Sequence, residues 1–198
     1  MTDGSEPVEQ AVELHEALGD VVLTAEAIQA RVRELARDLT RDYAGKDLVL
    51  LCVLRGAVIF LADLARQIDL PLEMDFITLS SYGDNTTSSG TVRQIQGLAT
   101  SISGRDALIV EDIVDTGQTL AHLLRTLQRR KPASLRVCTL LDKGRMVDPA
   151  LTPAYTGFHI PQHFVVGYGL DYAQKYRNLP YIAILKPEVY APENAPEN

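Results

Sequence analysis

The stretch DALIVEDIVDTGQTLAHLLRTLQRR, residues 106–130, decides the fold class. It begins with a short apolar run, Asp106–Glu111, that predicts a strand buried on both faces. It ends with Thr119–Arg130, which predicts an amphipathic helix that Pro132 terminates. The apolar side of that helix carries Leu120, Leu123, Leu124 and Leu127. A buried strand that leads through a small turn into an amphipathic helix is the repeating unit of α/β folds.

The same unit occurs earlier in the chain. Leu48–Leu54 is a continuous apolar run, and AVIFLADLARQI at residues 57–68 predicts the helix that follows it. An earlier helix is expected between a Thr24 cap and Gly45. Its apolar side carries Ile28, Val32, Leu35 and Leu39. Further strands are predicted around residues 76–82 and 92–97, and at 135–141, 164–167 and 181–185. The pattern predicts a mostly parallel central sheet flanked by helices, with ligands at the carboxyl ends of the strands.

One domain is expected, at residues 16–190, between two disordered tails. A chain of 198 residues has the length of a single domain with a real core. Residues 1–15 begin with a polar and acidic run, and residues 191–198 are rich in proline and charge. Inside the domain, GDNTTSSG at residues 83–90 has no apolar anchor and predicts a flexible loop. That loop is either a lid over a site or a hairpin tip without a function.

Composition and charge exclude several classes of protein. The formal net charge of −7 argues against a general nucleic-acid binder, which needs a basic face. No apolar stretch reaches the roughly 20 residues of a membrane span, and the first residues do not resemble a signal peptide. Cys52 and Cys138 lie in apolar runs and are expected to be free core thiols. The prediction is a cytoplasmic protein with neither a nucleic-acid nor a membrane partner.

The turn DTGQT, residues 115–119, is the strongest candidate for a binding site. A turn at a helix start exposes backbone N–H groups and the positive end of the helix dipole, which together suit a phosphate. Gly117 lets the backbone approach a ligand closely, and the hydroxyls of Thr116 and Thr119 can donate to phosphate oxygens. Alternatively, Asp115 or Thr116 only caps the helix.

Two adjacent carboxylates, Glu111 and Asp112, end the predicted strand before this turn. Carboxylates there can accept the protons of ribose hydroxyls and organise a hydrated Mg²⁺ ion. Alternatively, the two acids lie in a solvated loop. Together with the phosphate turn, they indicate a site for a phosphorylated, metal-bound ribose.

Three competing motifs do not fit. The chain has no G-x-x-x-x-G-K-[ST] segment, so it lacks a P-loop. GYGLDY at residues 167–172 carries Tyr172 where a dinucleotide-binding motif needs its third glycine. A calcium loop that starts at Asp112 would need an oxygen ligand at Val114, which has none.

The segment 109–119 resembles the phosphoribosyl diphosphate (PRPP) motif of the type I phosphoribosyltransferases. From about Leu48 to Tyr190 the chain is similar to their hypoxanthine-guanine branch, in a bacterial form. Five other motifs, in the family's order, carry the resemblance. They are VLRGAVIF (53–60), SSYG (80–83), LLDKGR (140–145), FVVGYGLDY (164–172) and YRNLPYI (176–182). The family's fold adds a small hood, at about residues 143–182, and a flexible lid loop, at about 80–92, to the central sheet.

The resemblance implies roles for the residues of these motifs. Arg55, Gly56 and Arg177 would bind pyrophosphate, because guanidinium groups match phosphate oxygens. Where many relatives carry lysine this chain has Arg55, which keeps the charge. The lid would act through Ser81 and Tyr82. The resemblance also implies a cis peptide between Leu54 and Arg55.

For the base and the ribose phosphate, the resemblance implies a second set of residues. Lys143 would donate to O6 of the purine, which favours 6-oxo over 6-amino bases. Phe164 would stack on the base, and the backbone of Val165 would contact its edge. Asp171 would bind Mg²⁺ near C2 of the purine. The phosphate turn would contribute Thr116, Gly117, Gln118 and Thr119, and the metal ligands would be Glu111, Asp112 and Asp171.

The expected activity is purine salvage. Hypoxanthine or guanine would react with PRPP and Mg²⁺ to give IMP or GMP and pyrophosphate, with Asp115 as the general base. Relatives are usually dimers or tetramers, so a homodimer or homotetramer is expected. Two alternatives stay open: a transferase that prefers xanthine, and a regulatory RNA-binding protein on the same scaffold.

Overall fold

The computed structural model describes residues 16–81, 93–146 and 148–191, and for residues 80, 81 and 93–96 the backbone only. The main sheet has the strand order β4-β3-β2-β5-β6-β7. Its strands are β2 (Leu48–Val53), β3 (Leu72–Ser81), β4 (Arg93–Gln96), β5 (Asp106–Val114), β6 (Ser134–Asp142) and β7 (Tyr155–His159). Five of them are parallel, and β4 alone pairs antiparallel, with β3. The predicted mostly parallel sheet is confirmed.

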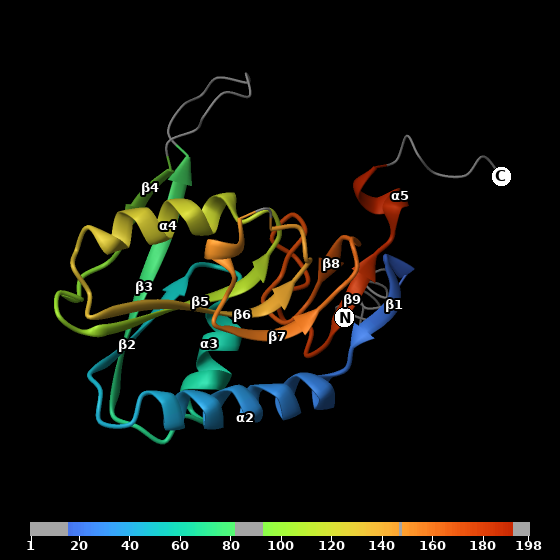
Figure 1. Cartoon of the computed structure of the whole chain (residues 1–198). Helices are drawn as coiled ribbons and strands as arrows, with labels where there is room; N and C mark the ends of the chain where they lie inside the picture. The colour runs from blue at the N-terminus through green and yellow to red at the C-terminus, as the bar shows by residue number, and fades with distance from the viewer. Residues whose placement is uncertain (1–15, 82–92, 147, 192–198) are drawn as a thin grey trace, which may run out of the picture.

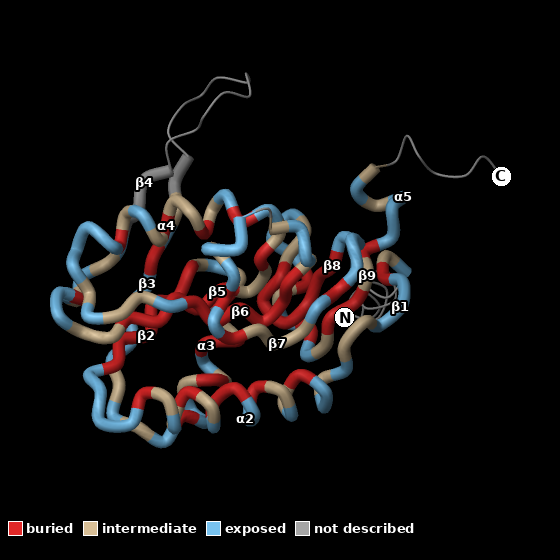
Figure 2. The backbone as a smooth tube through the Cα atoms, viewed as in Figure 1, coloured by how far each residue is buried: buried red, intermediate tan, exposed pale blue. Residues whose placement is uncertain are grey.

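Helices cover both faces of this sheet (Figure 1). Helices α2 (Ala25–Asp42) and α3 (Val58–Ala65) pack on one face, and α4 (Gln118–Gln128) packs on the other. Strand β2 shows why the apolar run is continuous, since its successive side chains point to opposite faces. Leu48, Leu50 and Cys52 contact the α2 and α3 side, whereas Val49, Leu51 and Val53 contact the α4 side. The buried residues accordingly run through the central strands (Figure 2).

The predicted first helix is confirmed in detail. Thr24 is the N-cap of α2, and its Oγ1 accepts a hydrogen bond of 3.2 Å from the backbone N–H of Ala27. The four apolar positions predicted for its inner side are all buried; they are Ile28, Val32, Leu35 and Leu39. This helix therefore supplies much of the core on the α2 and α3 side of the sheet.

A second, three-stranded sheet stands beside the main one. Its antiparallel strands have the order β1-β9-β8 and are β1 (Leu18–Leu23), β9 (Ile182–Leu185) and β8 (Val165–Val166). The short helix α5 (Pro187–Tyr190) follows β9, and a 3-10 turn, η1, spans Pro149–Leu151. Strands β8 and β9 lie within the ranges predicted for them.

Two strands and several boundaries depart from the sequence prediction; for example, β3 begins at Leu72 rather than near residue 76, and α3 ends at Ala65 rather than at residue 68. Strands β1 and β7 were not predicted, because β1 is mostly exposed and β7 lies at the edge of its sheet, so neither has a long apolar run. The acids Glu111 and Asp112 do not end β5. The strand continues to Val114, because its pairing with β6 extends as far as Asp142.

The remaining predictions concern the tails, the cysteines and the membrane. Both predicted tails lie outside the described residues, except Ala191. Cys52 and Cys138 are free and buried, as expected. Within the described ranges, no helix is both long and apolar enough to cross a bilayer.

Candidate active site

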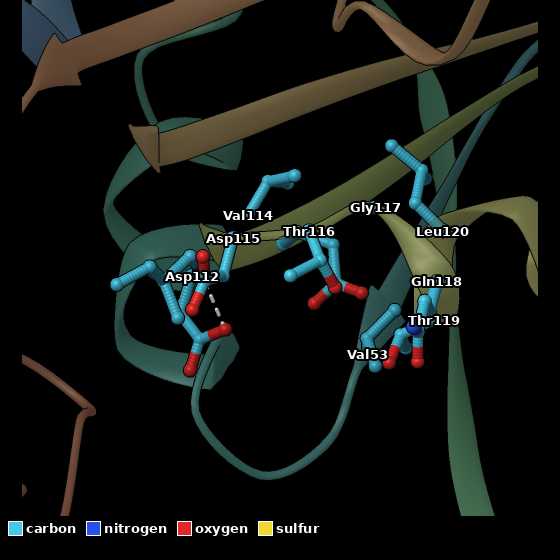
Figure 3. A pocket seen from close by; sticks show the side chains of 11 residues that line it. Val53, Asp112, Val114, Asp115, Thr116, Gly117, Gln118, Thr119 and Leu120 are labelled. Carbon is cyan, nitrogen blue, oxygen red and sulfur yellow. Dashed lines mark hydrogen bonds between the residues drawn. The ribbon is translucent and has the colours of Figure 1, made fainter. Parts of the chain in front are cut away.

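A cavity of about 230 Å³ opens at the point where the strand order of the main sheet reverses. The chain goes from β2 to β3 on one side and returns to β5 on the other, and ligands of open α/β sheets bind at such a point. The cavity is lined by Val53 at the end of β2 and by residues 111–120 (Figure 3). Both acids and the whole predicted phosphate turn therefore face one space.

The turn leads into α4 through Gly117, the N-cap of that helix. Gly117 has a φ of +79°, a left-handed conformation that favours glycine. A Cβ here would also lie 3.2 Å from Cγ of Met146 and 3.3 Å from Cδ1 of Leu151. Thr116 and Gln118 are exposed, and Thr119 is half-buried. Residues 117–120, where α4 begins, all line the cavity. The backbone N–H groups of a first helical turn point toward the N-terminal end of the helix.

Asp112 is packed tightly against the loop that follows β2. A Cβ on Gly56 would fall 1.5 Å from Oδ2 of Asp112, so only glycine leaves room for this carboxylate. Its Oδ1 accepts a hydrogen bond of 2.8 Å from the backbone N–H of Ile113. Burial raises the pKa of Asp112 to about 6, although hydrogen bonds from the backbone and the nearby charge of Arg177 oppose the rise.

A second cavity, of about 190 Å³, adjoins the first and shares Asp112 and Ile113 with it. Its other lining residues are Lys143, Phe164, Val165, Leu170 and Asp171. Lys143 follows β6, and its backbone N–H donates to the carbonyl of Val114 at 3.0 Å. Four predicted base-site residues, separated by up to 28 positions, therefore line one space with the strand acid.

Aromatic rings form one wall of this second cavity. The ring of Phe164 is 38% exposed and meets Tyr172 edge-on, with centroids 5.9 Å apart and an interplanar angle of 89°. Tyr190 stacks on Phe164, with centroids 5.0 Å apart and an angle of 26°. Phe164 thus has a defined aromatic surrounding and still offers ring surface to the cavity.

The two predicted pyrophosphate arginines meet at Gln174. Its Oε1 accepts from Nη1 of Arg55 at 3.0 Å and from Nη2 of Arg177 at 3.5 Å. Arg177 also pairs with Oδ1 of Asp171 at 2.7 Å and donates to the carbonyl of Gly169 at 2.7 Å. The Leu54–Arg55 peptide is cis, as the sequence resemblance implies.

Asp115 lines the first cavity and forms an ion pair with Arg145. The guanidinium Nη1 of Arg145 lies 3.3 Å from Oδ1 and 3.4 Å from Oδ2 of Asp115. Both side chains are about half exposed, so the pair adds little stability and either partner can turn to another charged group. Glu111 is buried and lines the same cavity as Asp115.

The predicted lid lies largely outside the described residues. Strand β3 ends at Ser81, whose backbone alone is described, and Tyr82 and residues 83–92 lie beyond the description. Ser81 nevertheless stands at the carboxyl end of a strand next to β2, on the edge of the sheet that carries the other site residues.

Comparisons with known proteins agree with this geometry. A family model for the phosphoribosyl transferase domain matches residues 20–173. The hypoxanthine-guanine phosphoribosyltransferase of Mycobacterium avium is 54% identical over 176 residues, which cover 86% of this chain and 87% of that protein. The chain belongs to the hypoxanthine-guanine phosphoribosyltransferase family.

Two further relatives extend this family assignment. A crystal structure of a hypoxanthine phosphoribosyltransferase from Staphylococcus aureus matches with a TM-score of 0.83 at 48% identity and covers 90% of this chain and 97% of that one. The chain is also 48% identical, over 90% of its length, to the bifunctional protein TilS/HprT of Listeria innocua, of whose length it spans 28%. The expected type I phosphoribosyltransferase fold is thereby confirmed.

Sequence reasoning missed some residues of this phosphoribosyltransferase site. Arg145 could have been noticed as a second cation, since it stands two positions after Lys143 in LLDKGR. Gln174 and Tyr190 give no such signal, because a lone glutamine in a loop and a tyrosine near the chain end are common. Their contacts depend on how distant segments pack.

Proposed function

We propose that this chain is a purine-salvage transferase that moves the 5-phosphoribosyl group from PRPP to N9 of hypoxanthine or guanine. The observation that carries the proposal is the pair of adjoining cavities that share Asp112 and Ile113. One has the features of a ribose-phosphate site, and the other has those of a site for a 6-oxo purine. The boundary between them is where a bond between ribose and base would form.

The first cavity suits ribose 5-phosphate. The backbone N–H groups at the start of α4 and the hydroxyls of Thr116 and Thr119, all from residues that line this cavity, can donate to phosphate oxygens. Gly117 and Gln118 complete the turn around the anion. Glu111 and Asp112 lie further back along β5, where carboxylates can accept the protons of the ribose hydroxyls.

The second cavity suits a flat base with an oxygen at C6. Lys143 supplies three N–H donors and no acceptor, so it pairs with a 6-oxo group and leaves a 6-amino group unsatisfied. Phe164 offers ring surface for stacking, and the backbone of Val165 contacts the edge of the base. These features favour hypoxanthine and guanine over adenine.

Pyrophosphate is assigned to Arg55, Gly56 and Arg177. The two guanidinium groups already converge on the Oε1 of Gln174, a neutral oxygen that an anionic oxygen can replace. Gly56 lies against Asp112, so this pyrophosphate loop touches the boundary of both cavities. The departing group would therefore leave on the side of β2.

Asp115 is proposed as the general base. A purine that attacks the anomeric carbon through N9 must lose a proton, and a carboxylate near N7 can take or stabilise it. Asp115 directly follows β5 and lines the first cavity together with Ile113, which also lines the second cavity. Closure of the lid at Ser81 and Tyr82 would exclude water and so prevent hydrolysis of PRPP.

Mg²⁺ is proposed to enter together with PRPP. Among the described residues, no group of three or more His, Cys, Asp or Glu side chains is placed to hold an ion by itself. That fits Mg²⁺, which keeps several waters and binds through one or two carboxylates and substrate phosphates. The raised pKa of Asp112 also fits, because a nearby cation favours its charged form. When bound, the ion would offset negative charge on the departing pyrophosphate.

Asp171 is the third proposed metal contact. Its Oδ1 pairs with Arg177, and its Oδ2 accepts from the backbone N–H of Gln174 at 2.9 Å. Both oxygens are thus held in place by protein donors, and each keeps a lone pair with which Asp171 can contact Mg²⁺ directly or through water. Glu111 and Asp112 would hold the hydrated ion from the other side of the ribose.

The test is to supply each purine base separately with PRPP and Mg²⁺ and to measure nucleotide formation. Hypoxanthine and guanine should react faster than xanthine and adenine. A faster rate with xanthine would replace the proposal by the xanthine transferase. Specific RNA binding in a gel shift, without consumption of any base, would favour the regulatory protein, which the net charge of −7 opposes.

We also propose that the chain forms a homodimer or homotetramer in the cytoplasm. Met74 and Phe76, two residues apart on β3, share a face of that strand and are 50% and 40% exposed. The two buried free thiols suit a reducing compartment. Light scattering that gives a mass near 21.8 kDa, the mass of one chain, would refute the assembly.

A further inference from the structure

The four-residue helix α5 brings Tyr190 onto the aromatic wall of the second cavity. Tyr190 stacks on Phe164 with ring centroids 5.0 Å apart and an interplanar angle of 26°. Tyr190 does not line the cavity, whereas Phe164 does. The tyrosine therefore covers part of the Phe164 ring that the cavity does not use.

The orientation of the Phe164 ring depends on contacts of its side chain. The carbonyl of Phe164 accepts from the backbone N–H of Leu185 at 2.9 Å, a bond that holds the main chain and does not involve the ring. The ring is 38% exposed, so the core does not enclose it. Only ring contacts with Tyr172 and Tyr190 are described around it. A stacking surface whose plane is held in advance strengthens base binding, because the ring need not be ordered when the base enters.

Helix α5 is itself fixed at several points. The hydroxyl of Tyr172 donates to the carbonyl of Val189 at 3.1 Å. The backbone N–H of Lys186 donates to the carbonyl of Ala17 at 3.1 Å, and its Nζ donates to the carbonyl of Glu16 at 2.6 Å. The segment that carries Tyr190 is thus hydrogen-bonded both to the residues just before β1 and to Tyr172, the other aromatic neighbour of Phe164.

We propose that Tyr190 is a positioning residue for purine binding, which holds the ring of Phe164 in the plane on which the base stacks. This inference rests on the proposed function, because it assigns the second cavity to the base. Tyr172 contributes twice, through its edge-on ring and through the hydrogen bond that secures α5. Helix α5 thereby supports the base site although Tyr190 does not line the cavity.

The test compares Tyr190→Ala with Tyr190→Phe in the full chain. Loss of an aromatic pair should raise KM for hypoxanthine and for guanine by about 2- to 12-fold, the range expected for one such contact. KM for PRPP should stay within about 2-fold of the wild-type value, because neither Phe164 nor Tyr190 lines the first cavity. Tyr190→Phe keeps the stacked ring and should restore the wild-type KM for both bases.

Two further variants separate positioning from general stability. Glu188→Ala alters an exposed residue of the same helix and should change neither KM. Tyr172→Phe removes the bond to Val189 and should raise KM for the bases in the same selective way, by a smaller factor. If Tyr190→Ala lowers the melting temperature but leaves KM for the bases unchanged, or raises KM for PRPP equally, the proposal is wrong.

A measurement without turnover keeps this inference separate from the proposed function. The chain has four phenylalanines, so ring signals of ¹³C-labelled phenylalanine are resolvable, and Phe164→Leu assigns the one of interest. That signal should shift or broaden in Tyr190→Ala and return in Tyr190→Phe. An unchanged signal in Tyr190→Ala would refute the positioning role, whereas an inactive wild-type protein with the expected ring signals would refute only the purine activity.

Discussion

Replacement of Asp112 by asparagine should make the protein more stable at neutral pH and at the same time weaken PRPP binding. Asparagine has the shape of aspartate, so it fits beside Gly56, where no larger group has room. Its amide oxygen can still accept from the backbone N–H of Ile113, as Oδ1 of Asp112 does at 2.8 Å. The substitution therefore removes a partly buried charge and its attraction to Arg177, and it leaves the packing unchanged.

The size of the effect follows from the pKa of Asp112. Its pKa is about 6 in the folded chain, raised by burial from 3.8. Each tenfold change in proton affinity is worth about 1.4 kcal/mol, so the charged side chain costs the folded state up to about 3 kcal/mol at neutral pH. Because the folded pKa is the higher one, this cost is fully present above about pH 6 and vanishes as the pH falls below 3.8.

Urea unfolding of both proteins at pH 7.5 and at pH 4 measures this difference. At pH 7.5 the asparagine variant should gain about 1–3 kcal/mol in free energy of unfolding, or roughly 2–10 °C in Tm for a chain of this length. At pH 4 most of that gain should be lost. PRPP binding, followed by calorimetry with Mg²⁺, should be weaker in the variant. A stability gain that is the same at both pH values, or no gain at all, would refute the buried-charge reasoning.

Three other perturbations test the proposed roles of single residues and of the metal. Asp115→Asn should lower turnover by about 10²- to 10⁴-fold, the usual contribution of a positioned base, with PRPP binding largely kept; unchanged turnover would reject Asp115 as the base. Lys143→Ala should raise KM for hypoxanthine much more than KM for PRPP, and equal increases would show that Lys143 does not read the base. A chelator should abolish nucleotide formation and added Mg²⁺ should restore it, while activity that persists would remove Asp171 from the proposed metal site.

The sequence predicted the centre of the fold better than its edges. Strands β2 and β5 are buried on both faces, so their apolar runs are continuous and visible without any structure. Strand β1 is largely exposed and has an irregular register with β9, and its residues alone give no strand pattern. The predicted end of β5 was wrong for a similar reason, because pairing with β6 carries the acids into the strand.

The phosphate turn could be read from the sequence because all of its parts are consecutive. Residues 115–119 follow one strand and start one helix, so local geometry alone directs them to a single cavity. The base site was predicted through resemblance, since Lys143 and Phe164 belong to separate segments. Their common cavity becomes visible only when the two sheets stand side by side.

By itself, then, the sequence determined the α/β class, the helix that Thr24 caps and the turn at residues 115–119 that leads into α4, because each depends on contacts within a few residues. Only the tertiary structure decided the fit of Asp112 against Gly56, the contact of Arg145 with Asp115 and the stacking of Tyr190 on Phe164. Each of these joins segments that are distant along the chain. Their energies depend on the separation of side chains in space, which the packing of strands and loops sets and which no local pattern of residues records.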